Sequence, residues 1–241
     1  MVCRVSFLLM TLLLGGCSDG GGLRSDGAVD RGIPDAPVVK LDQQPIPVET
    51  GADAPLPDMA QATVLAAPFF LDFDQDDGRL VGTRDWEWGQ LSFLAGKNCD
   101  SSTYYAPSLG HSGMGMWGTK LNDCYSPLNN AQAACSNEDL VDDSVLTVKV
   151  SLPATLPNPR LTYWEWADYF LAFDWTEVRI DGSVTQQSCT GSLPVPPKWE
   201  KRSIDLKQWA GRTITITFHF MASSVVNRSG WYIDDMAVNS D

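Results

Sequence analysis

Residues 213–220 read Thr-Ile-Thr-Ile-Thr-Phe-His-Phe, an unbroken alternation of polar and apolar side chains. Successive side chains of a β-strand point to opposite faces, so this pattern predicts a strand with one buried and one more polar face. Ile214, Ile216, Phe218 and Phe220 form the apolar side. The stretch therefore indicates a domain built from β-strands.

Weaker versions of the same pattern lie on both sides of this stretch. They predict further strands at residues 69–73, 145–152, 160–166, 177–180 and 231–238. Turn signals such as Asp181-Gly182 separate them, and a short turn within 203–209 is the main helical feature. Many short strands joined by turns are typical of an antiparallel sandwich. We predict one all-β, jelly-roll β-sandwich domain over residues 64–241.

The composition separates this domain from the segment that precedes it. All nine tryptophans lie after residue 64, whereas residues 17–63 contain many prolines, glycines and aspartates and no aromatic residue. Such a segment buries too little apolar surface to offset the loss of chain entropy, which predicts a disordered tether. The net charge of −13 argues against a nucleic-acid partner, because nucleic acids bind basic surfaces.

The first residues have the layout of an export signal. Arg4 precedes an apolar run at residues 7–14 that is too short to span a bilayer, and two glycines then lead to Cys17. This arrangement resembles the lipobox of bacterial lipoproteins, which implies removal of residues 1–16 and a lipid on Cys17. Ser18 favours the outer membrane. We expect a lipid-anchored protein of the bacterial cell envelope, periplasmic or surface-exposed; an ordinary secretory signal is the alternative.

Four cysteines fall within the predicted domain: Cys99, Cys124, Cys135 and Cys189. An even number in an exported chain predicts two disulfides, with buried free thiols as the alternative. Three pairings are possible. The short polar loop between Cys124 and Cys135 makes that pair the preferred one, which would leave Cys99 to pair with Cys189.

Six strings of the domain occur in an order and spacing that resemble one group of β-sandwich modules. They are LDFDQDDG (71–78), DWEWG (85–89), HSGMGMWGTKLNDCY (111–125), LTYWEW (161–166), WEKRSIDLKQWAG (199–211) and SGWYIDDMAV (229–238). The modules are those appended to secreted bacterial metallopeptidases of the immune inhibitor A and bacillopeptidase F types, and they are similar to the MAM domain of animal surface proteins. The resemblance implies a jelly-roll fold and a non-catalytic role in adhesion or recognition.

Acidic residues gather in two of these strings. Asp72 and Asp74 lie at the end of the first predicted strand, and Asp234 and Asp235 lie in the last. The first and last strands of a jelly roll can be neighbours, and Ca²⁺ takes six to eight oxygen ligands. The resemblance to MAM-like domains implies a structural Ca²⁺ at these four positions. The alternative is an acidic turn together with a buried carboxylate that is hydrogen-bonded to the backbone.

Trp164 and Trp166 lie on one side of the predicted strand 160–166, opposite Leu161 and Tyr163. One pair must face the core, and the tryptophans are the preferred pair for that position. If they face outward instead, they form a flat apolar platform for sugar rings or for a protein loop. Trp164 and Trp166 are therefore the candidate ligand-binding residues.

Two groups of residues suggest hydrolysis, and neither is complete. Residues 110–114 read GHSGM, which lacks the final glycine and the strand–turn–helix context of a G-x-S-x-G nucleophile elbow. Glu165, Asp168, Asp174 and Glu177 supply carboxylates, but a glycosidase needs two of them at a defined separation across a cleft. We predict no catalytic residue.

These patterns together predict a cell-envelope lipoprotein that presents a non-catalytic recognition or adhesion module for a glycan or a protein. An accessory module that stabilises or holds a secreted metallopeptidase is the second hypothesis. A hydrolase is the third.

Overall fold

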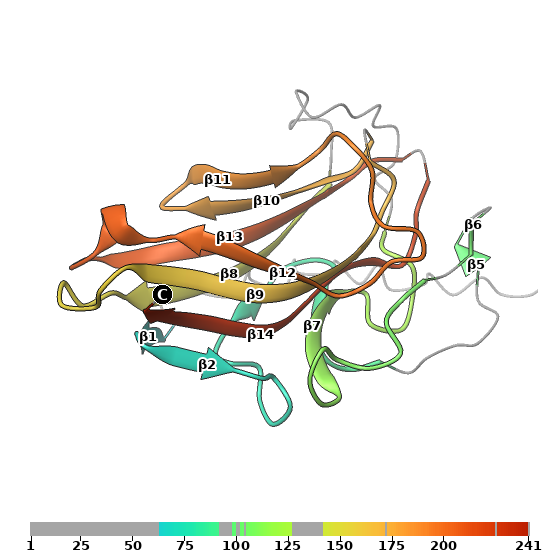
Figure 1. The fold of residues 1–241 in the computed structure, drawn as a ribbon. Coiled ribbons are helices and arrows are strands. Elements are labelled where there is room, and N and C mark those ends of the chain that lie inside the picture. The colour runs from blue at the N-terminus through green and yellow to red at the C-terminus, as the bar shows by residue number, and fades with distance from the viewer. Residues whose placement is uncertain are drawn as a thin grey trace, which may run out of the picture. The chain divides into compact units, whose positions relative to one another are not determined.

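The computed structural model describes residues 63–91, 98–99, 102–103, 105–126, 142–171, 173–224 and 226–240. The predicted signal peptide, the predicted tether, Cys17 and Cys135 lie outside these residues. Two β-sheets packed face to face make up most of the described part of the chain (Figure 1). The prediction of an all-β sandwich is therefore confirmed. No helix in the residues described is long and apolar enough to cross a membrane.

The first sheet contains the strand predicted at residues 213–220. Its order is β1 (Val64–Ala66), β8 (Asp142–Ser151), β13 (Thr213–Ala222), β10 (Trp175–Ile180) and β11 (Ser183–Ser188), and β3 (Val81–Gly82) also pairs with β8. All pairings are antiparallel except that of β1 with β8. Short strands β1 and β3 pair with successive parts of β8, whose other neighbour is β13.

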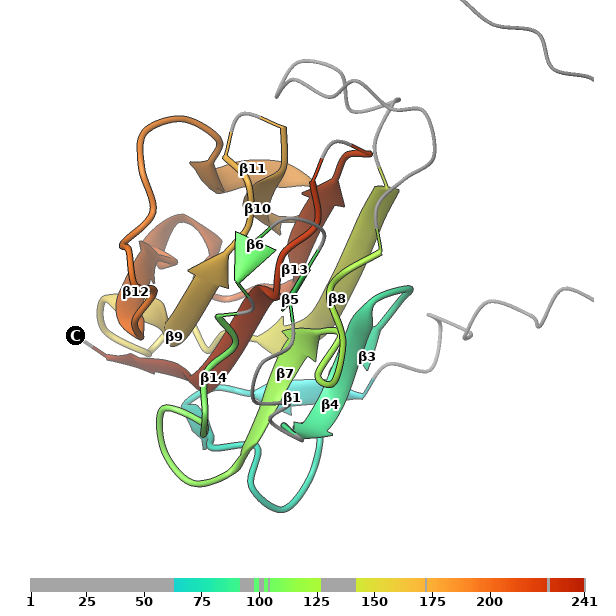
Figure 2. The same cartoon turned by 90° about the vertical axis from the view of Figure 1, so that its right-hand side faces the viewer.

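The second sheet brings the two ends of the domain together. Its order is β12 (Glu200–Asp205), β9 (Pro159–Asp168), β14 (Gly230–Ser240), β7 (Gly115–Thr119) and β4 (Trp86–Gln90), and β2 (Phe69–Leu71) also pairs with β14. The expectation that the strand at 69–71 neighbours the last strand is thus correct. A small hairpin of β5 (Asn98–Cys99) and β6 (Ser102–Thr103) lies at the end of the sandwich that faces the viewer in Figure 2.

The main core lies between the two sheets and follows the predicted alternation. Ile214, Ile216, Phe218 and Phe220 of β13 are at most 1% exposed. They pack in one apolar cluster with buried side chains of β8, β9 and β14. Burial of each such side chain contributes roughly 1.5–3 kcal/mol. The short turn expected near residue 209 is a 3₁₀ helix, η3 (Lys207–Trp209).

The outer face of the second sheet carries a smaller apolar cluster. Its buried members are Cys99, Ala106, Met116, Leu121 and Tyr232, and Trp166 and Trp199 pack against them half-buried. Residues of the segment between β6 and β7 therefore cover part of this face. That cover explains why β14 is buried along nearly its whole length rather than at alternate positions.

Candidate functional site

Residues 105–115, here called the covering segment, are fixed to the second sheet by acidic side chains. Oδ1 of Asp74 accepts the backbone N–H groups of Met114 (2.7 Å) and Gly115 (2.9 Å). Oδ2 of Asp234 accepts the N–H of Ser112 at 3.1 Å. These bonds hold the end of the covering segment against both the first and the last strand regions of the domain.

Glycine is required where the covering segment passes Asp74. Gly113 has φ of +63°, and a Cβ built there would lie 1.8 Å from Oδ2 of Asp74. A Cβ on Gly115 would lie 2.1 Å from the carbonyl oxygen of Phe73. The glycines of the GHSGMG string therefore allow close approach of two backbones, which is a structural reason for a pattern that resembles a nucleophile elbow.

Asp235 lies in an irregularity of β14, with φ of +47° and a shift of register between Asp234 and Ala237. Its Oδ2 is 2.5 Å from Nδ1 of His111, and its Oδ1 accepts the hydroxyl of Ser112 at 2.5 Å. In a catalytic triad the imidazole lies between the serine and the carboxylate. Here the carboxylate lies between the other two, so this geometry does not activate Ser112 as a nucleophile.

Asp234 and Asp74 have pKa values that shift in opposite directions. The pKa of Asp234 is raised to about 7, because burial, together with the charge of Asp235, outweighs the lowering effect of backbone N–H donors from Asp235 and Ser112. Hydrogen bonds from the backbone of Gly115 and Met114 lower the pKa of Asp74. The charged form of Asp234 is thus less favoured than that of Asp74.

The four aspartates predicted to bind Ca²⁺ act as hydrogen-bond acceptors. Asp72 accepts the N–H of Asp74 at 3.2 Å, and Oδ1 of Asp234 accepts the N–H of Asp235 at 2.7 Å. Among the residues that the structure describes, no three His, Cys, Asp or Glu side chains are placed to share a metal ion. The donors present fit the hydrogen-bonded alternative better than a cation, and Ca²⁺ stays a prediction.

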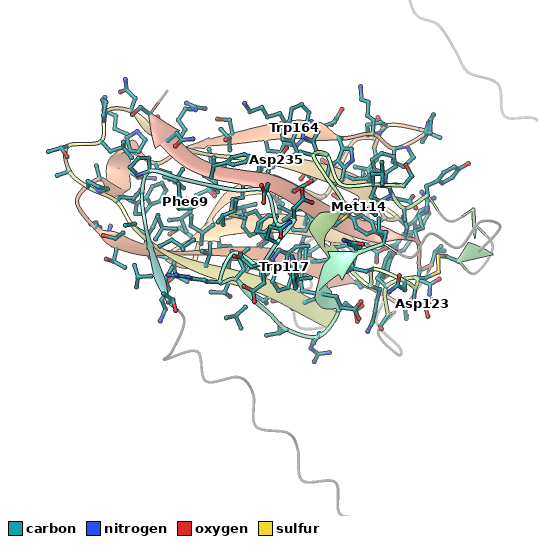
Figure 3. All side chains as sticks on the ribbon, turned by 90° about the horizontal axis from the view of Figure 1, so that it is seen from below. Phe69, Met114, Trp117, Asp123, Trp164 and Asp235 are labelled. Carbon is teal, nitrogen blue, oxygen red and sulfur yellow. A yellow bond between two sulfur atoms is a disulfide. The ribbon has the colours of Figure 1, made fainter. Side chains whose placement is uncertain are left out.

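Trp164 and Trp166 lie on the outer face of β9, whereas Leu161 and Tyr163 are fully buried in the core. The preference for a core position of the tryptophans is therefore wrong. The physical reason is that the covering segment already shields them: Nε1 of Trp166 donates to the carbonyl oxygen of Tyr105 at 2.7 Å. Figure 3 shows where Trp164 and Asp235 lie on the ribbon.

Two further residues, His111 and Trp199, complete an aromatic group around these tryptophans. Neither was assigned to the ligand-binding site from the sequence. The His111 ring stacks on Trp164, with centroids 3.7 Å apart and planes at 12°. Trp199 meets His111 edge-on at 6.2 Å and Trp166 at 6.0 Å. We call His111, Trp164, Trp166 and Trp199 the aromatic cluster. The three tryptophans are half-buried, and His111 is exposed.

Large apolar side chains of the covering segment face solvent. Tyr105, Leu109 and Met114 are 41%, 53% and 50% exposed, and Trp88 of β4 is 40% exposed. Nε1 of Trp88 donates to the carbonyl oxygen of Phe73, next to the residue that holds Met114. Exposed apolar side chains gathered on one segment are typical of an interaction surface.

The carboxylates considered for glycoside hydrolysis are buried and each is held by a donor. The pairs are Glu165 with Arg202 (2.6 Å), Asp168 with the Ser229 hydroxyl (2.6 Å), Asp174 with the Ser223 N–H (2.7 Å) and Glu177 with Arg179 (2.6 Å). Burial raises the pKa of Glu165 and of Asp174. These carboxylates are thus occupied by structural partners.

Cys99 and Cys124 form a disulfide with a Cα–Cα distance of 5.7 Å. The preferred pairing of Cys124 with Cys135, and of Cys99 with Cys189, is therefore wrong. Cys189 is also disulfide-bonded. The Cys99–Cys124 bond joins the β5–β6 hairpin to the segment after β7, within the small apolar cluster on the outer face. Loop length alone did not reveal that these segments meet.

Comparison with known proteins gives distant similarities. No family model matches the chain. Bacillopeptidase F of Bacillus subtilis (strain 168) is 24% identical over an alignment that covers 88% of this chain and 14% of that protein. This chain thus spans about one seventh of the length of that relative.

Two solved structures have low similarity to this chain. The K1 cleaved adhesin domain of Lys-gingipain from Porphyromonas gingivalis W83 has 14% identity and a TM-score of 0.40, over 72% of this chain and 98% of that chain. The CBM27-1 domain of Caldicellulosiruptor saccharolyticus, in complex with mannohexaose, has 11% identity and a TM-score of 0.41, over 72% and 97%. Similarities of this size do not assign a ligand, so function has to be inferred from the site itself.

Proposed function

We propose that this domain is a non-catalytic module that recognises a glycan, held at the bacterial cell envelope by a lipid on Cys17 and the tether 17–63. The observation that carries the proposal is the outward position of the aromatic cluster on β9 and beside β12. Three tryptophans grouped on one face of a sheet, and left half-exposed, are unusual unless they contact a partner.

The aromatic cluster suits a sugar ring for physical reasons. The C–H face of a sugar is apolar, and a tryptophan ring offers a large flat surface with little conformational freedom to lose. Ring–ring contacts and the hydrogen bond from Trp166 to Tyr105 fix the orientation of the rings before a ligand arrives. Such preorganisation lowers the entropy cost of binding.

The polar groups nearest to the aromatic cluster support recognition rather than turnover. His111 and Ser112 both bind Asp235, and this arrangement orients the covering segment. The carboxylates of Glu165 and Asp174 are enclosed by their own partners in the sandwich interior. A module of this kind would act by holding its ligand at the surface.

The test is a glycan array probed with the full-length protein, followed by titration calorimetry on the strongest ligand. Trp164→Ala is expected to weaken binding at least tenfold, because it removes the ring on which His111 stacks. Phe70→Ala, which removes an exposed aromatic side chain of β2, is the matched control and should leave binding unchanged. Absence of any glycan ligand, or unchanged affinity in the Trp164 variant, would refute the proposal.

A second function, an accessory module for a secreted peptidase, is favoured by the similarity to a part of bacillopeptidase F. The exposed Tyr105, Leu109 and Met114 would then seat a protein surface. This alternative predicts no sugar binding. It also predicts that a peptidase copurifies with the full-length protein from envelope extracts and is lost when Leu109 is changed to Asp.

A further inference from the structure

A groove lies along the edge of the sandwich where β11 of the first sheet and β12 of the second sheet face each other. Two adjoining hollows of about 400 and 410 Å³ make up the groove, and both are lined by Gln186 and Ser203. β11 and β12 are the last strands of their sheets in the residues described, so the groove is open at the side. Its size is in the range of small-ligand sites.

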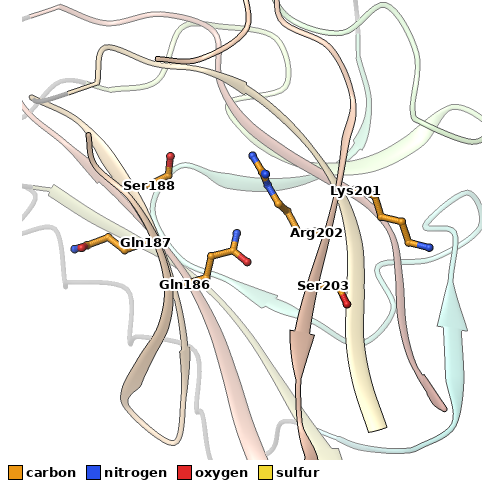
Figure 4. Close-up of a pocket in the computed structure, with 6 residues that line it drawn as sticks. All are labelled: Gln186, Gln187, Ser188, Lys201, Arg202 and Ser203. Carbon is orange, nitrogen blue, oxygen red and sulfur yellow. The ribbon is translucent and has the colours of Figure 1, made fainter. Parts of the chain in front are cut away.

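The polar end of the groove is lined by side chains that converge from the two strands. Figure 4 shows Gln186 of β11 and Arg202 of β12 pointing toward one another, with Ser188 beside them. Gln187 and Lys201 point away from this space in the same view. A ligand in the groove would therefore contact amide, hydroxyl and guanidinium groups together.

The side chains of Gln186 and Arg202 are held in position by hydrogen bonds to other side chains. Nε2 of Gln186 donates to the hydroxyl of Tyr163 at 3.0 Å, and Tyr163 is fully buried. Nε of Arg202 donates to Glu165 at 2.6 Å, and its Nη2 donates to Glu200 at 3.1 Å. Within the described part of the chain, no hydrogen bond engages the amide oxygen of Gln186 or Nη1 of Arg202, so both can meet a ligand.

Burial of the Glu165 carboxylate beneath Arg202 is energetically unfavourable. Glu165 is 5% exposed, and its second oxygen accepts Nε1 of Trp231 at 3.0 Å. An ion pair in such a place often contributes less to stability than an apolar pair of the same size. Its effect here is to fix the position of the guanidinium at the groove, as a preorganised binding site requires.

The charge of the groove selects among ligands. Arg202 is balanced by Glu165 and Glu200. The other charged residues that line the two hollows, Lys201 and Asp205, carry opposite charges, so neither sign predominates in this lining. The other hollow adds apolar surface from Val184, Ile204 and Trp209. Paired polar groups next to apolar patches match a ligand that has many hydroxyls, C–H faces and no charge.

We propose that this groove is a second glycan site, which binds a neutral, extended oligosaccharide through Gln186, Ser188, Ser203 and Arg202. The inference rests on the proposed function, because it takes the ligand of this protein to be a glycan. It adds a separate location, at the β11–β12 edge, and a preference for uncharged sugars.

The experiment compares four forms of the full-length protein by titration calorimetry: wild type, Gln186→Leu, Gln187→Leu and Trp164→Ala. The probes are neutral hexasaccharides of mannose and of glucose, with a hexamer of galacturonic acid as the charged counterpart. Gln187→Leu is the matched control, since it removes a neighbouring amide that points away and binds Glu177 at 2.6 Å. Gln186→Leu is expected to weaken binding of a neutral probe at least tenfold, and Gln187→Leu less than twofold.

The outcomes separate the two sites. Binding that depends on Trp164 but not on Gln186 would overturn the groove and leave the proposed function in place. Equal or tighter binding of the galacturonic acid hexamer would overturn the preference for neutral sugars. No binding of any sugar would overturn both proposals. If Gln186→Leu does not fold, as judged by its melting curve, Ser188→Ala gives the same test with a smaller change and an expected loss of at least threefold.

Discussion

The imidazole Nδ1 of His111 lies 2.5 Å from Oδ2 of Asp235, and the same ring stacks on Trp164. One carboxylate thus sets the orientation of a ring that belongs to the aromatic cluster. Because Oδ1 of Asp235 also accepts the Ser112 hydroxyl, the covering segment depends on this residue at two adjacent positions.

Changing Asp235 to Asn should loosen the covering segment. Asparagine tolerates the positive φ at this position but carries no charge, and one of its two side-chain heteroatoms is an N–H₂ group that cannot accept, so the two bonds made by the carboxylate are weakened. We expect a loss of about 1–3 kcal/mol in the free energy of unfolding. Hydrogen exchange of the Ser112 and Met114 amides should accelerate. Asp77→Asn, at an exposed turn, is the control; unchanged exchange in the Asp235 variant would contradict the role given to this carboxylate.

The raised pKa of Asp234 predicts a fall in stability between about pH 4 and pH 7. Its pKa is about 7 in the folded protein and near 3.8 when unfolded, so the folded state binds more protons in that window. The corresponding stability is present below pH 4 and is lost as the pH rises toward 7. Three pKa units correspond to on the order of 4 kcal/mol.

The measurement for Asp234 is urea unfolding of wild type and Asp234→Asn at each half pH unit. The variant cannot titrate at this position, so its stability should fall less steeply across the window. Parallel curves for the two proteins would show that Asp234 keeps an ordinary pKa.

Removing Arg202 should be costly because it strands a buried charge. Arg202→Met leaves Glu165 without its cation, and breaking a buried pair in this way costs about 3–5 kcal/mol at pH 7. The pKa of Glu165, already raised by burial, should rise further, so the loss should be smaller at pH 5 than at pH 7. The double variant Glu165→Gln with Arg202→Met should recover most of the stability. A pH-independent loss that the double variant does not reverse would argue for packing alone.

The disulfide between Cys99 and Cys124 should stabilise the domain by constraining the unfolded chain. The two cysteines are 25 residues apart, and closing a loop of that size contributes about 3 kcal/mol. Replacing both by serine should lower the free energy of unfolding by this amount. Peptide mapping without reduction should recover the Cys99–Cys124 pair. Recovery of a Cys124–Cys135 peptide instead would restore the pairing preferred from the sequence.

The calcium prediction can be tested directly by thermal unfolding. If Ca²⁺ binds among Asp72, Asp74, Asp234 and Asp235, EDTA should lower the melting temperature, and Ca²⁺ at 100 times its dissociation constant should add about 2.7 kcal/mol. Asp72→Asn should remove the response. An unchanged melting curve, in protein shown to contain no metal, would assign these carboxylates to hydrogen bonding alone.

The alternation in residues 213–220 and 160–166 was sufficient to predict the strands, because side-chain burial has a period of two in a sandwich. It could not say which face of β9 is the inner one. Leu161 and Tyr163 compete with Trp164 and Trp166 on apolar character alone, and the outcome depends on a distant segment that covers the outer face. That segment, residues 105–115, has no strand or helix periodicity by which its position could be predicted.

The acidic residues illustrate a second limit of sequence reasoning. The neighbourhood of the strand 69–71 and the last strand was predictable, since both ends of a jelly roll often share a sheet. The sequence did not reveal that these carboxylates accept backbone hydrogen bonds. Asp74 and Asp234 hold backbone N–H groups of residues 112–115, and this depends on the close approach that Gly113 permits. Likewise, the β11–β12 groove joins residues that neither share a strand nor form a motif.

The short strands β1 and β3 lie along the outer edge of β8, where Val64 to Ala66 pair with residues 149–151 and Val81 with Thr147. Without them, a ten-residue strand rich in valine would offer unpaired backbone groups to a neighbouring molecule. Copies of the domain that come close together would then be prone to join edge to edge into fibrils. The two small strands thus protect the edge of β8 against self-association. A chain that begins at residue 67, and so lacks β1, should aggregate more readily than one that begins at residue 53.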